Sequence, residues 1–434
     1  MPDLDYFAIA LYGLPVVAFV AIHIVRRMRR GAAHAKELAA AVQAGLLEPV
    51  SLHPIVVDPS RCVGSGSCVD VCPESALGII DGKAQLTNPA VCIGHGACAA
   101  ACPVNAIALV FGSERRGVDI PRVDPNFETN VPGIFIAGEL GGMGLIRKAA
   151  EQGRQAVETI AARKAATPLD LVIVGAGPAG IAAGLNAIHR KLRYRLIEQE
   201  PDLGGAILHY PRNKIAMTSP VDLPIVGRLP IGEISKEDLL ATWQDVVVRS
   251  GLRIDFDTRM ESLARIAHGY RIATTQGTLE TANVLLAIGR RGTPRKLDVP
   301  GEEMSKVVYR LIEPEQYRGK RVLVVGGGDS AVECALACSA QPGTTVVLAY
   351  RGEVFNRIKP ANRQRLEEAG AAGRVDIRLR TEVKSVADGR VELVAGDGAA
   401  ILENDVVIVQ AGGVLPTALL RELGVTIETK YGTA

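Results

Sequence analysis

Apolar residues in this chain fall into short continuous runs that are separated by glycine-rich turns and by stretches of small, helix-forming residues. Clear runs cover residues 169–174, 284–288 and 345–349. Short apolar runs bounded by turn signals are typical of strands buried on both faces, and their alternation with helical stretches indicates a parallel sheet. The pattern therefore predicts an α/β fold for most of the chain.

One apolar run, residues 6–25, differs because it is uncharged and long enough to cross a bilayer as a helix. Arg26, Arg27, Arg29 and Arg30 follow it directly. Basic residues beside a span mark the cytoplasmic side, so residues 1–30 are predicted to form a single-pass anchor in the inner (cytoplasmic) membrane, with the catalytic domains facing the cytoplasm. The alternative is a signal peptide, but the run is long for one and the basic residues follow it.

Length and composition add bounds to this picture. The 434 residues are enough for two or more domains, and 48% hydrophobic content supports sizeable cores. The net charge is +2 and residues 26–30 are the one short basic cluster, so no nucleic-acid partner is expected. An alanine-rich stretch, residues 31–47, predicts a helix near the membrane, within a linker assigned to residues 31–54.

Six of the eight cysteines lie between positions 62 and 102, in two copies of the pattern Cys-x5-Cys-x3-Cys-Pro about thirty residues apart. The repeat resembles the bacterial two-cluster ferredoxin run, with Ser65 and His95 replacing the second cysteine of each copy. Residues 55–121 are therefore expected to form a small α+β ferredoxin-like domain. The resemblance implies one cluster on Cys62, Cys68 and Cys102, and a second on Cys92, Cys98 and Cys72.

The type of cluster stays open at this stage. Ser65 and His95 either ligate iron or stand aside, which leaves 4Fe-4S and 3Fe-4S clusters as alternatives. Three cysteines and a histidine are also a common zinc set. Zinc would explain His95 but neither Ser65 nor the repeated Cys-Pro ends, so iron-sulfur is the favoured interpretation.

A glycine turn follows the strand at residues 169–174. Its glycines have the GxGxxG spacing, and Glu198 closes the next strand about twenty positions on. Such glycines allow a tight turn, close approach of a pyrophosphate and close helix packing, and the carboxylate suits a ribose hydroxyl. The predicted dinucleotide-binding residues are Gly175, Gly177, Gly180 and Glu198.

A second turn of this kind follows the strand at residues 320–325, with alanine in the third glycine position. Its residues are Gly326, Gly328, Asp329, Ser330 and Ala331. Two such turns about 150 residues apart resemble the flavin and pyridine-nucleotide domains of the thioredoxin-reductase-like, two-nucleotide flavoproteins. The resemblance covers residues from about 122 to the end.

The order of the segments departs from that family. Residues 129–156 match the segment that closes those proteins, yet here they precede the glycine turn that opens them. The chain is therefore expected to be circularly permuted. Residues 122–296, completed by residues 409–434, form the predicted FAD domain, and residues 297–408 form the predicted NAD(P) domain.

Further FAD contacts follow from the resemblance. Gly204 and Gly205 match the loop that passes the isoalloxazine, and Gly289 lies in the return strand out of the flavin domain. Gly138 and Glu139 match the Gly-Asp pair that caps the ribityl and pyrophosphate region, with Glu replacing Asp.

The strand at residues 345–349 is followed by Arg351 where NAD-binding proteins place an acid. A guanidinium can pair with a 2'-phosphate, so Arg351 predicts NADP as the preferred nucleotide. The NADPH-dependent relatives place more arginines here, and Arg357 is one position displaced from the expected place. Arg351 as a solvated strand-end residue is the alternative.

No Cys-x2-Cys redox pair occurs anywhere in the chain, and Cys334 and Cys338 are spaced for packing on a helix. The predicted function is therefore an NAD(P)H-dependent FAD and iron-sulfur oxidoreductase that exchanges electrons with a redox protein (ferredoxin or cytochrome) or a quinone. No catalytic side chain is assigned, and a homodimer is left open. The alternatives are a disulfide reductase with a dithiol supplied in trans and a redox sensor without fast turnover.

Overall fold

The computed structural model of the protein describes residues 3–432 except 48, 50, 51, 57, 115–116, 143, 164–166, 211, 213, 291–292, 357, 397 and 415, and it leaves the side chains of residues 3–10, 217 and 293 undescribed. The chain forms two compact units. One comprises Met1–Val118, Asn356–Pro360 and Lys430–Ala434, and the other comprises Asp119–Phe355 and Ala361–Thr429.

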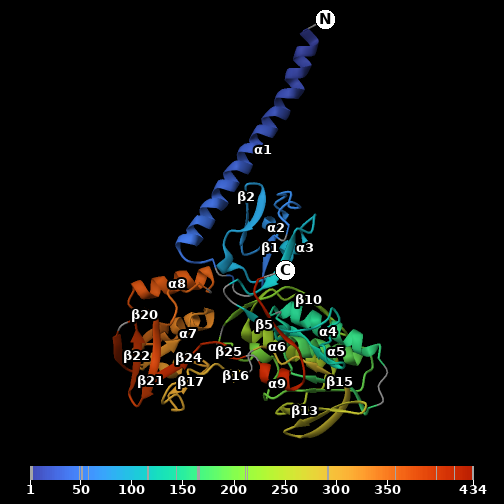
Figure 1. Cartoon of the computed structure of the whole chain (residues 1–434), viewed down its shortest axis with the longest axis vertical. Helices are drawn as coiled ribbons and strands as arrows, with labels where there is room; N and C mark the ends of the chain where they lie inside the picture. The colour runs from blue at the N-terminus through green and yellow to red at the C-terminus, as the bar shows by residue number, and fades with distance from the viewer. Residues whose placement is uncertain are drawn as a thin grey trace. The chain divides into compact units, whose positions relative to one another are not determined.

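The first unit begins with one continuous helix, α1 (Asp3–Gln43), shown in blue in Figure 1. From Leu11 onward α1 is long and apolar enough to cross a membrane, the single helix of this kind among the described residues. The separate linker helix expected over residues 31–47 is instead the last part of α1, because the alanine-rich sequence continues the helix without a break. The helix ends where Gly45 takes a positive φ of 67° and the Leu46 N–H donates to the Ala41 carbonyl.

The cysteine-rich part of this unit consists of two antiparallel pairs and two short helices. Strand β1 (Leu52–Val56) pairs with β4 (Ile107–Phe111), and β2 (Leu77–Ile80) pairs with β3 (Lys83–Leu86). Helices α2 (Ser67–Asp70) and α3 (Ala97–Ala100) each follow a glycine with positive φ, Gly66 and Gly96. The internal repeat in the sequence is thus a repeat in the structure. Strand β1 begins three residues before the expected boundary at Ile55.

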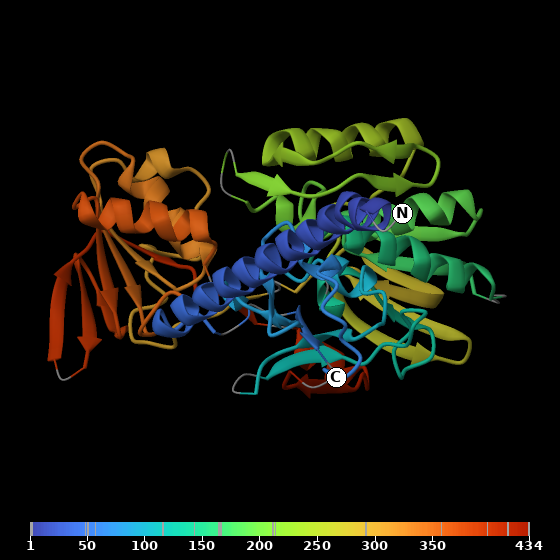
Figure 2. The same cartoon turned by 90° about the horizontal axis from the view of Figure 1, so that it is seen from above.

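The first sheet of the second unit carries the first glycine turn (Figure 2). Its order is β13-β14-β15-β7-β8, and β6 pairs with β15; strands β13 and β14 are drawn in yellow in Figure 2. The strands β6, β7, β8 and β15 are parallel neighbours. The bounds are β6 (Ile134–Ile136), β7 (Leu169–Val174), β8 (Tyr194–Ile197), β13 (Met260–Ile266), β14 (Gly269–Thr274) and β15 (Gly277–Leu286).

Alternate residues of these strands face two hydrophobic clusters. On one face, Phe135, Leu171 and Ile173 pack with residues of helices α4 (Ile146–Ala161), α5 (Pro178–His189) and α6 (Lys236–Ser250). On the other face, Ile134 and Val172 pack with Leu420 and Val425 at helix α9 (Thr417–Glu422). Residues 134–161 and the C-terminal segment therefore both pack on the sheet that contains the glycine-turn strand.

The second sheet of this unit is parallel, with the order β17-β24-β18-β19-β20. Helix α7 (Asp329–Ser339) follows β18, and helix α8 (Pro360–Ala371) follows β19 in the chain. An antiparallel sheet of β21, β22 and β23 adjoins it. The bounds are β17 (Val307–Val308), β18 (Arg321–Val325), β19 (Thr345–Tyr350), β20 (Val375–Leu379), β21 (Thr381–Ala387), β22 (Arg390–Ala395), β23 (Gly398–Glu403) and β24 (Val406–Val409). The α/β prediction is thereby confirmed.

Short elements complete the fold. The strand pairs are β5 (Val118–Pro121) with β26 (Ile427–Lys430), β9 (Ile215–Met217) with β12 (Glu233–Ser235), β10 (Val221–Leu223) with β11 (Gly227–Leu229), and β16 (Thr293–Pro294) with β25 (Gly413–Val414). The 3-10 turns are Pro89–Val91, Gly138–Gly141, Gly205–Ile207 and Pro314–Tyr317.

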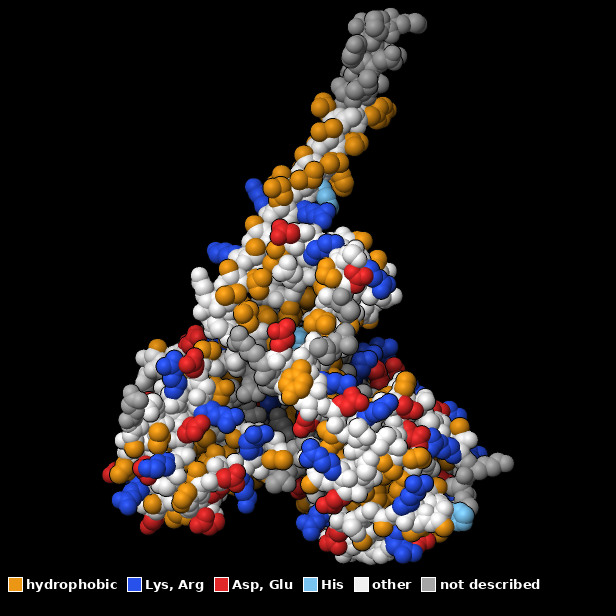
Figure 3. Space-filling view, viewed as in Figure 1, with side chains coloured by type: hydrophobic (Ala, Val, Ile, Leu, Met, Phe, Trp, Pro, Cys, Tyr) orange, Lys and Arg blue, Asp and Glu red, His pale blue; other side chains and the backbone are white. Residues whose placement is uncertain are grey.

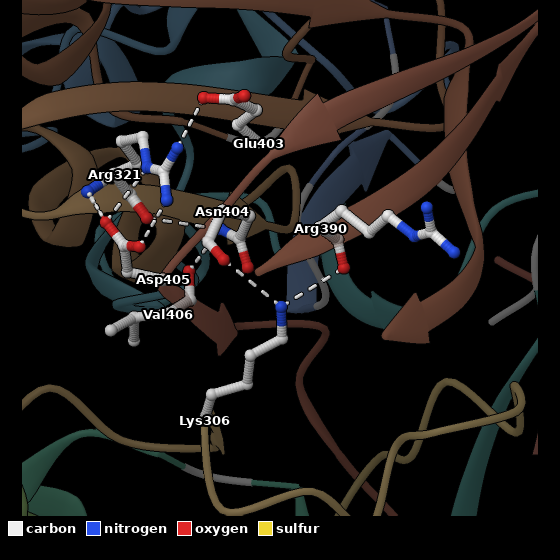
Figure 4. Close-up of polar contacts among 7 residues, drawn as sticks. All are labelled: Lys306, Arg321, Arg390, Glu403, Asn404, Asp405 and Val406. Carbon is white, nitrogen blue, oxygen red and sulfur yellow. Dashed lines mark hydrogen bonds and ion pairs between the residues drawn. The ribbon is translucent and has the colours of Figure 1, made fainter. Parts of the chain in front are cut away.

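A polar network ties the start of β18 to the start of β24 (Figure 4). The Arg321 guanidinium donates to Asp405 at 2.6 and 3.1 Å and to Glu403 at 2.5 Å. Lys306 Nζ donates to the carbonyls of Arg390 and Asn404 at 3.1 and 3.2 Å. Because this network lies at the amino ends of parallel strands, opposite the edge that carries the glycine turn, it is structural.

Candidate functional site

The first glycine turn is closely packed against its own sheet and helix. Gly175 has φ 106°, and a Cβ there would lie 2.6 Å from the Ala287 carbonyl oxygen. A Cβ on Gly180 would overlap the Gly175 carbonyl oxygen. A side chain at either position would therefore push α5 away from β7.

The loop of Gly204 and Gly205 passes directly over this turn. The Gly204 N–H donates to the Ala176 carbonyl at 2.9 Å, and a Cβ on Gly205 would lie 3.1 Å from the Gly177 Cα. Around Gly177 itself no atom comes closer than 3.8 Å to the place a Cβ would take. A Cβ at Gly177 would thus make only ordinary van der Waals contact, so this backbone is less crowded than that of Gly175 or Gly180, as the approach of a pyrophosphate requires.

Glu198 is buried beside the same turn. Its Oε2 accepts from the Ala176 N–H at 2.6 Å and its Oε1 accepts from the Glu200 N–H at 3.0 Å. Burial raises the pKa of this carboxyl, and the backbone donors oppose that shift. The side chain is held at the carboxyl end of β8, where an acidic residue can bind a ribose.

Gly138 precedes the first glycine turn in sequence. It lies against α5, the helix that follows this turn. With φ 82°, a Cβ on Gly138 would lie 3.1 Å from the Ala179 Cβ, and its N–H donates to Gln152 Oε1 at 2.9 Å. Glycines and the acid from four separate segments therefore meet at one edge of the sheet. They are Gly138, Gly175, Gly177, Gly180, Glu198, Gly204 and Gly205.

Glu139 exerts an electrostatic influence on Arg290, a cation that the sequence did not single out. Burial lowers the pKa of Arg290, while the negative charges of Glu139 and Asp119 raise it. The Arg290 guanidinium donates to the Asp119 carbonyl at 3.1 Å. Next to Arg290, Gly289 has φ 66° and nothing within 4 Å of the place of a Cβ. The only sequence signal was a pair of arginines after Gly289, of which Arg291 lies outside the described residues.

The second glycine turn repeats the geometry of the first. Gly326 has φ 152°, and a Cβ there would overlap the Gln410 carbonyl oxygen, while Gly328 has open space around the same position. Ala331 is fully buried and its N–H donates to the Gly328 carbonyl at 3.0 Å. Asp329 accepts from Asn362 Nδ2 at 2.7 Å. Asp329 and Ser330 are the first two residues of α7.

An aromatic side chain lies beside this second turn. A Cβ on Gly327 or on Gly352 would run into the Tyr350 ring, and that ring stacks on Phe355 with centroids 5.2 Å apart. Tyr350 was missed from the sequence, where its only signal was an aromatic residue at a strand end. Arg351 follows it and is exposed. Arg357, the second candidate for a 2'-phosphate contact, lies outside the described residues.

The six clustered cysteines of the first unit divide between two cavities. The volume of the Cys62 cavity, including the open space at its mouth, is about 300 Å³. That of the Cys92 cavity, counted in the same way, is about 350 Å³. The Cys62 cavity is lined by Cys62, Cys68 and Cys102 together with Ser65, and the Cys92 cavity by Cys72, Cys92 and Cys98 together with His95. Each cavity therefore takes its third cysteine from the other copy of the repeat, as the ferredoxin resemblance implies.

Backbone N–H groups point at several of these sulfur atoms. Donors reach Cys62 from Ala84 at 3.4 Å, Cys72 from Ala76 at 3.4 Å and Cys102 from Ala106 at 3.2 Å. Such N–H groups stabilise thiolates and cluster sulfur. The residues present thus fit an iron-sulfur cluster in each cavity.

The cysteine pKa values reflect burial. Burial raises the pKa of the Cys68 and Cys98 thiols and that of Cys92 to about 11. Among the described residues no three His, Cys, Asp or Glu side chains are arranged to hold a single metal ion.

Cys334 and Cys338 lie fully buried on α7. The Cys334 thiol hydrogen-bonds with Cys338, and this bond and burial hold its pKa well above the ordinary value. A high pKa and a buried position make a thiol inert, which agrees with the packing role expected from the sequence.

Two protein families match separate parts of the chain. The family described as pyridine nucleotide-disulphide oxidoreductase matches residues 172–433, and the 4Fe-4S dicluster domain matches residues 54–103. The first match begins within β7 and excludes residues 122–171.

Among curated relatives, the chain is 30% identical over 276 residues to a ferredoxin–NADP reductase of Thermus thermophilus, which covers 61% of this chain and 79% of the relative. It is 28% identical over 280 residues to that of Rhodospirillum rubrum, with 60% and 78% covered.

Solved structures give the same fold. The bacillithiol disulfide reductase of Staphylococcus aureus superposes with a TM-score of 0.55 at 21% identity, covering 59% of this chain and 80% of that one. The Bacillus cereus enzyme of the same name gives 0.54 at 24% identity, with 59% and 82% covered. At these identities the likeness concerns the fold alone.

Proposed function

The chain belongs to the pyridine nucleotide-disulphide oxidoreductase family and is an NAD(P)H-dependent FAD oxidoreductase, and from this premise we propose that it is a membrane-anchored iron-sulfur flavoprotein. It passes electrons between NAD(P)H and a one-electron protein or a quinone. The observation that carries this proposal is the pair of cysteine-lined cavities in the region matched by a 4Fe-4S dicluster domain. The chain thus contains its own electron-carrier module in addition to the reductase core.

FAD supplies hydride acceptance and single-electron release, and the protein supplies its binding site. Gly175 and Gly180 keep the turn packed against its strand and helix, Gly177 leaves the backbone uncrowded for the pyrophosphate, and Glu198 can accept a hydrogen bond from a ribose hydroxyl. Gly204, Gly205, Gly138, Glu139 and Gly289 line the rest of the flavin site. Arg290, whose pKa is influenced by Glu139, would add a positive charge to this site.

The nucleotide site is the second glycine turn, with the helix start at Asp329 and Ser330 facing the pyrophosphate. Gly326, Gly328 and Ala331 keep this turn compact. Arg351 pairs with the 2'-phosphate of NADP, because an exposed guanidinium follows β19 where NAD-binding proteins have an acid.

The two clusters occupy the Cys62 and Cys92 cavities, each with three cysteine ligands. Ser65 and His95 stand where a fourth cysteine is usual, so each cluster is either a 4Fe-4S cluster with a non-cysteine ligand or a 3Fe-4S cluster. A ferredoxin-type partner is supported by the relatives named ferredoxin–NADP reductase.

Circular permutation explains the order of segments in the reductase core. The family match starts at residue 172, and about a fifth of the Thermus thermophilus and Rhodospirillum rubrum relatives stays uncovered. The pairing of β6 with β15, in parallel like that of β7, supports a place for residues 134–161 in this sheet. The C-terminal segment also leads into residues 122–130, because the Arg122 N–H donates to the Thr426 carbonyl and Asn130 bonds to Gly424 and Thr426.

A disulfide reductase with a dithiol in trans is the weaker function. It is suggested by the fold shared with bacillithiol disulfide reductases, but Cys334 and Cys338 are fully buried and no other described cysteine lies outside the two cavities. Such an enzyme would reduce disulfide substrates after its clusters had been removed. A redox sensor, the other alternative, would oxidise NAD(P)H very slowly with every acceptor.

Anaerobic purification followed by quantification of iron, acid-labile sulfide and flavin tests the proposal. One FAD and at least six irons per chain are expected, since each cavity would hold a cluster of three or four irons. NADPH titration should then bleach the flavin band and reduce the clusters. Zinc without acid-labile sulfide, or clusters that NADPH never reduces, would contradict it.

A further inference from the structure

The C-terminal half of α1 is fixed to the cysteine-rich part of its own unit. The residues of α1 that lose exposure recur at helical spacing and are Gly31, His34, Leu38 and Ala41. His34 Nδ1 accepts from the Ile79 N–H at 3.0 Å, and a Cβ on Gly78 would lie 2.7 Å from the His34 ring. One face of α1 therefore packs on the β2–β3 hairpin.

One turn earlier, α1 meets the loop that carries Cys62. The Arg27 guanidinium lies 3.4 Å from the places that a Cβ would take on Gly64 and on Gly82. Arg27 stands two residues after Val25, the last residue of the apolar run, which is about 3 Å along a helix axis. The polar headgroup layer is about 5–7 Å thick on each side of a bilayer. A helix that spans the membrane up to Val25 would thus hold this loop at headgroup level.

The loop, residues 61–66, has the composition of a membrane-contacting segment. Val63 is 61% exposed, and Arg61 beside it is exposed as well. Lys83 Nζ donates to the Cys62 carbonyl at 2.7 Å, which keeps a further cation beside the loop. Basic side chains also follow the apolar part of α1 (Figure 3). The acids nearby in sequence are Asp58, Asp70 and Asp81.

The second copy of the repeat lacks these features and serves as an internal comparison. Ile93, the counterpart of Val63, is half-buried, and a Cβ on Gly94 would lie 2.8 Å from the Leu52 carbonyl oxygen. A Cβ on Gly64 would likewise overlap the Gly82 carbonyl oxygen, so both loops are packed at this glycine. The difference lies at the tip, where Val63 is exposed and Ile93 is half-buried.

We propose that residues 61–66, together with Arg27 and Lys83, form a membrane-contact surface that binds anionic lipid headgroups. Val63 enters the interface and the cations meet lipid phosphates. The Cys62 cavity is then the one that faces the bilayer, and the Cys92 cavity faces away from it. This inference rests on the membrane anchor in the proposed function.

Hydrogen exchange on the full-length protein in lipid nanodiscs tests the surface. Discs of phosphatidylcholine alone are compared with discs that also contain phosphatidylglycerol. Exchange in residues 61–66 should be slowed, more strongly with the anionic lipid, while residues 91–96 should exchange alike in both. Equal slowing of the two loops, or no slowing of either, would overturn the proposal.

Two variants sharpen the result. Val63→Asp and Arg61→Gln should each lose the slowing while the protein stays in the discs and keeps its iron and acid-labile sulfide. Ile401→Asp, a change at a 71% exposed apolar residue of the second unit, should leave the slowing unchanged. Retained slowing in both loop variants would overturn the proposal. If the protein does not enter the discs at all, the membrane anchor is overturned together with the contact surface. If it enters the discs but the loop variants keep the slowing, the contact surface alone is overturned.

Discussion

Gly153 lies so close to the backbone of Ala179 that a methyl group on Gly153 would overlap the Ala179 carbonyl oxygen. This approach brings α4, which precedes the first glycine turn in sequence, onto α5, which follows it. The helix that orients Gly138 and Gln152 is thereby held against the dinucleotide turn.

Gly153→Ala should destabilise the second unit by about 1–3 kcal/mol, because the added methyl group must push two packed helices apart. Flavin should also dissociate more readily, since Gly138 rests on the same contact. Chemical unfolding and the fraction of bound FAD measure both effects. Gly232→Ala is the control, since no atom lies within 4 Å of the added methyl group; equal stability of the two variants would show that the helices are not tightly packed.

Cys68→Ala or Cys98→Ala should each remove most of the iron of one cluster while FAD stays bound, because the cysteines and the flavin site belong to separate compact units. Iron, sulfide and flavin contents are the measurements. Ser65→Ala and His95→Ala should instead change the potential or the cluster type, as seen by redox-controlled EPR. Loss of flavin in parallel with iron would contradict the separation.

Removal of residues 1–25 should release a soluble protein that still oxidises NADPH with artificial acceptors but no longer binds membranes. The docked part of α1 remains in this variant, so the cysteine-rich module keeps its contact with His34. Sedimentation with membranes and NADPH oxidation are measured together. Full-length protein that stays in the soluble fraction without detergent would refute the anchor.

Arg351→Ala should weaken NADPH more than NADH by about 1.5–3 kcal/mol, the range of a hydrogen bond to a charged group. The ratio of kcat/KM for the two nucleotides is the measurement. Arg271→Ala is the control. It removes an exposed arginine of β14 that is paired with Glu280 of β15, and it should leave that ratio unchanged. Equal use of both nucleotides by the unaltered protein would remove the basis for the assignment.

The Arg321–Asp405 pair should make the second sheet sensitive to acid. Hydrogen bonds from the Arg321 side chain and backbone lower the pKa of Asp405 to about 2. Because the folded-state pKa lies below the unfolded value of about 3.9, the pair contributes fully above that value and loses its contribution as the pH falls towards 2. Asp405→Asn should flatten this dependence, which hydrogen exchange in β18 between about pH 4 and 2 would measure. Asp245→Asn, at an exposed pair on α6, is the control.

Much of the fold and of the site could be read from local sequence. The turns at Gly175 and Gly326 were evident because backbone conformations with positive φ and close approaches require glycine at set spacings. The apolar run of α1 and the two cysteine repeats are equally local signals. Each of these signals can be interpreted from residues that are near one another in the chain.

Long-range packing decided the rest. The sharing of Cys102 and Cys72 between the two cavities was implied by a resemblance, and the structure brings those side chains together. Arg290 and Tyr350 had no motif, since their importance comes from Glu139 and Gly327, which lie far away in the chain. The sequence by itself determined which groups the protein has for dinucleotides and for iron, because turn geometry and ligand type are local properties. Only the tertiary structure decided which loop is exposed and which is covered, as Val63 and Ile93 illustrate, because burial depends on contacts between distant segments.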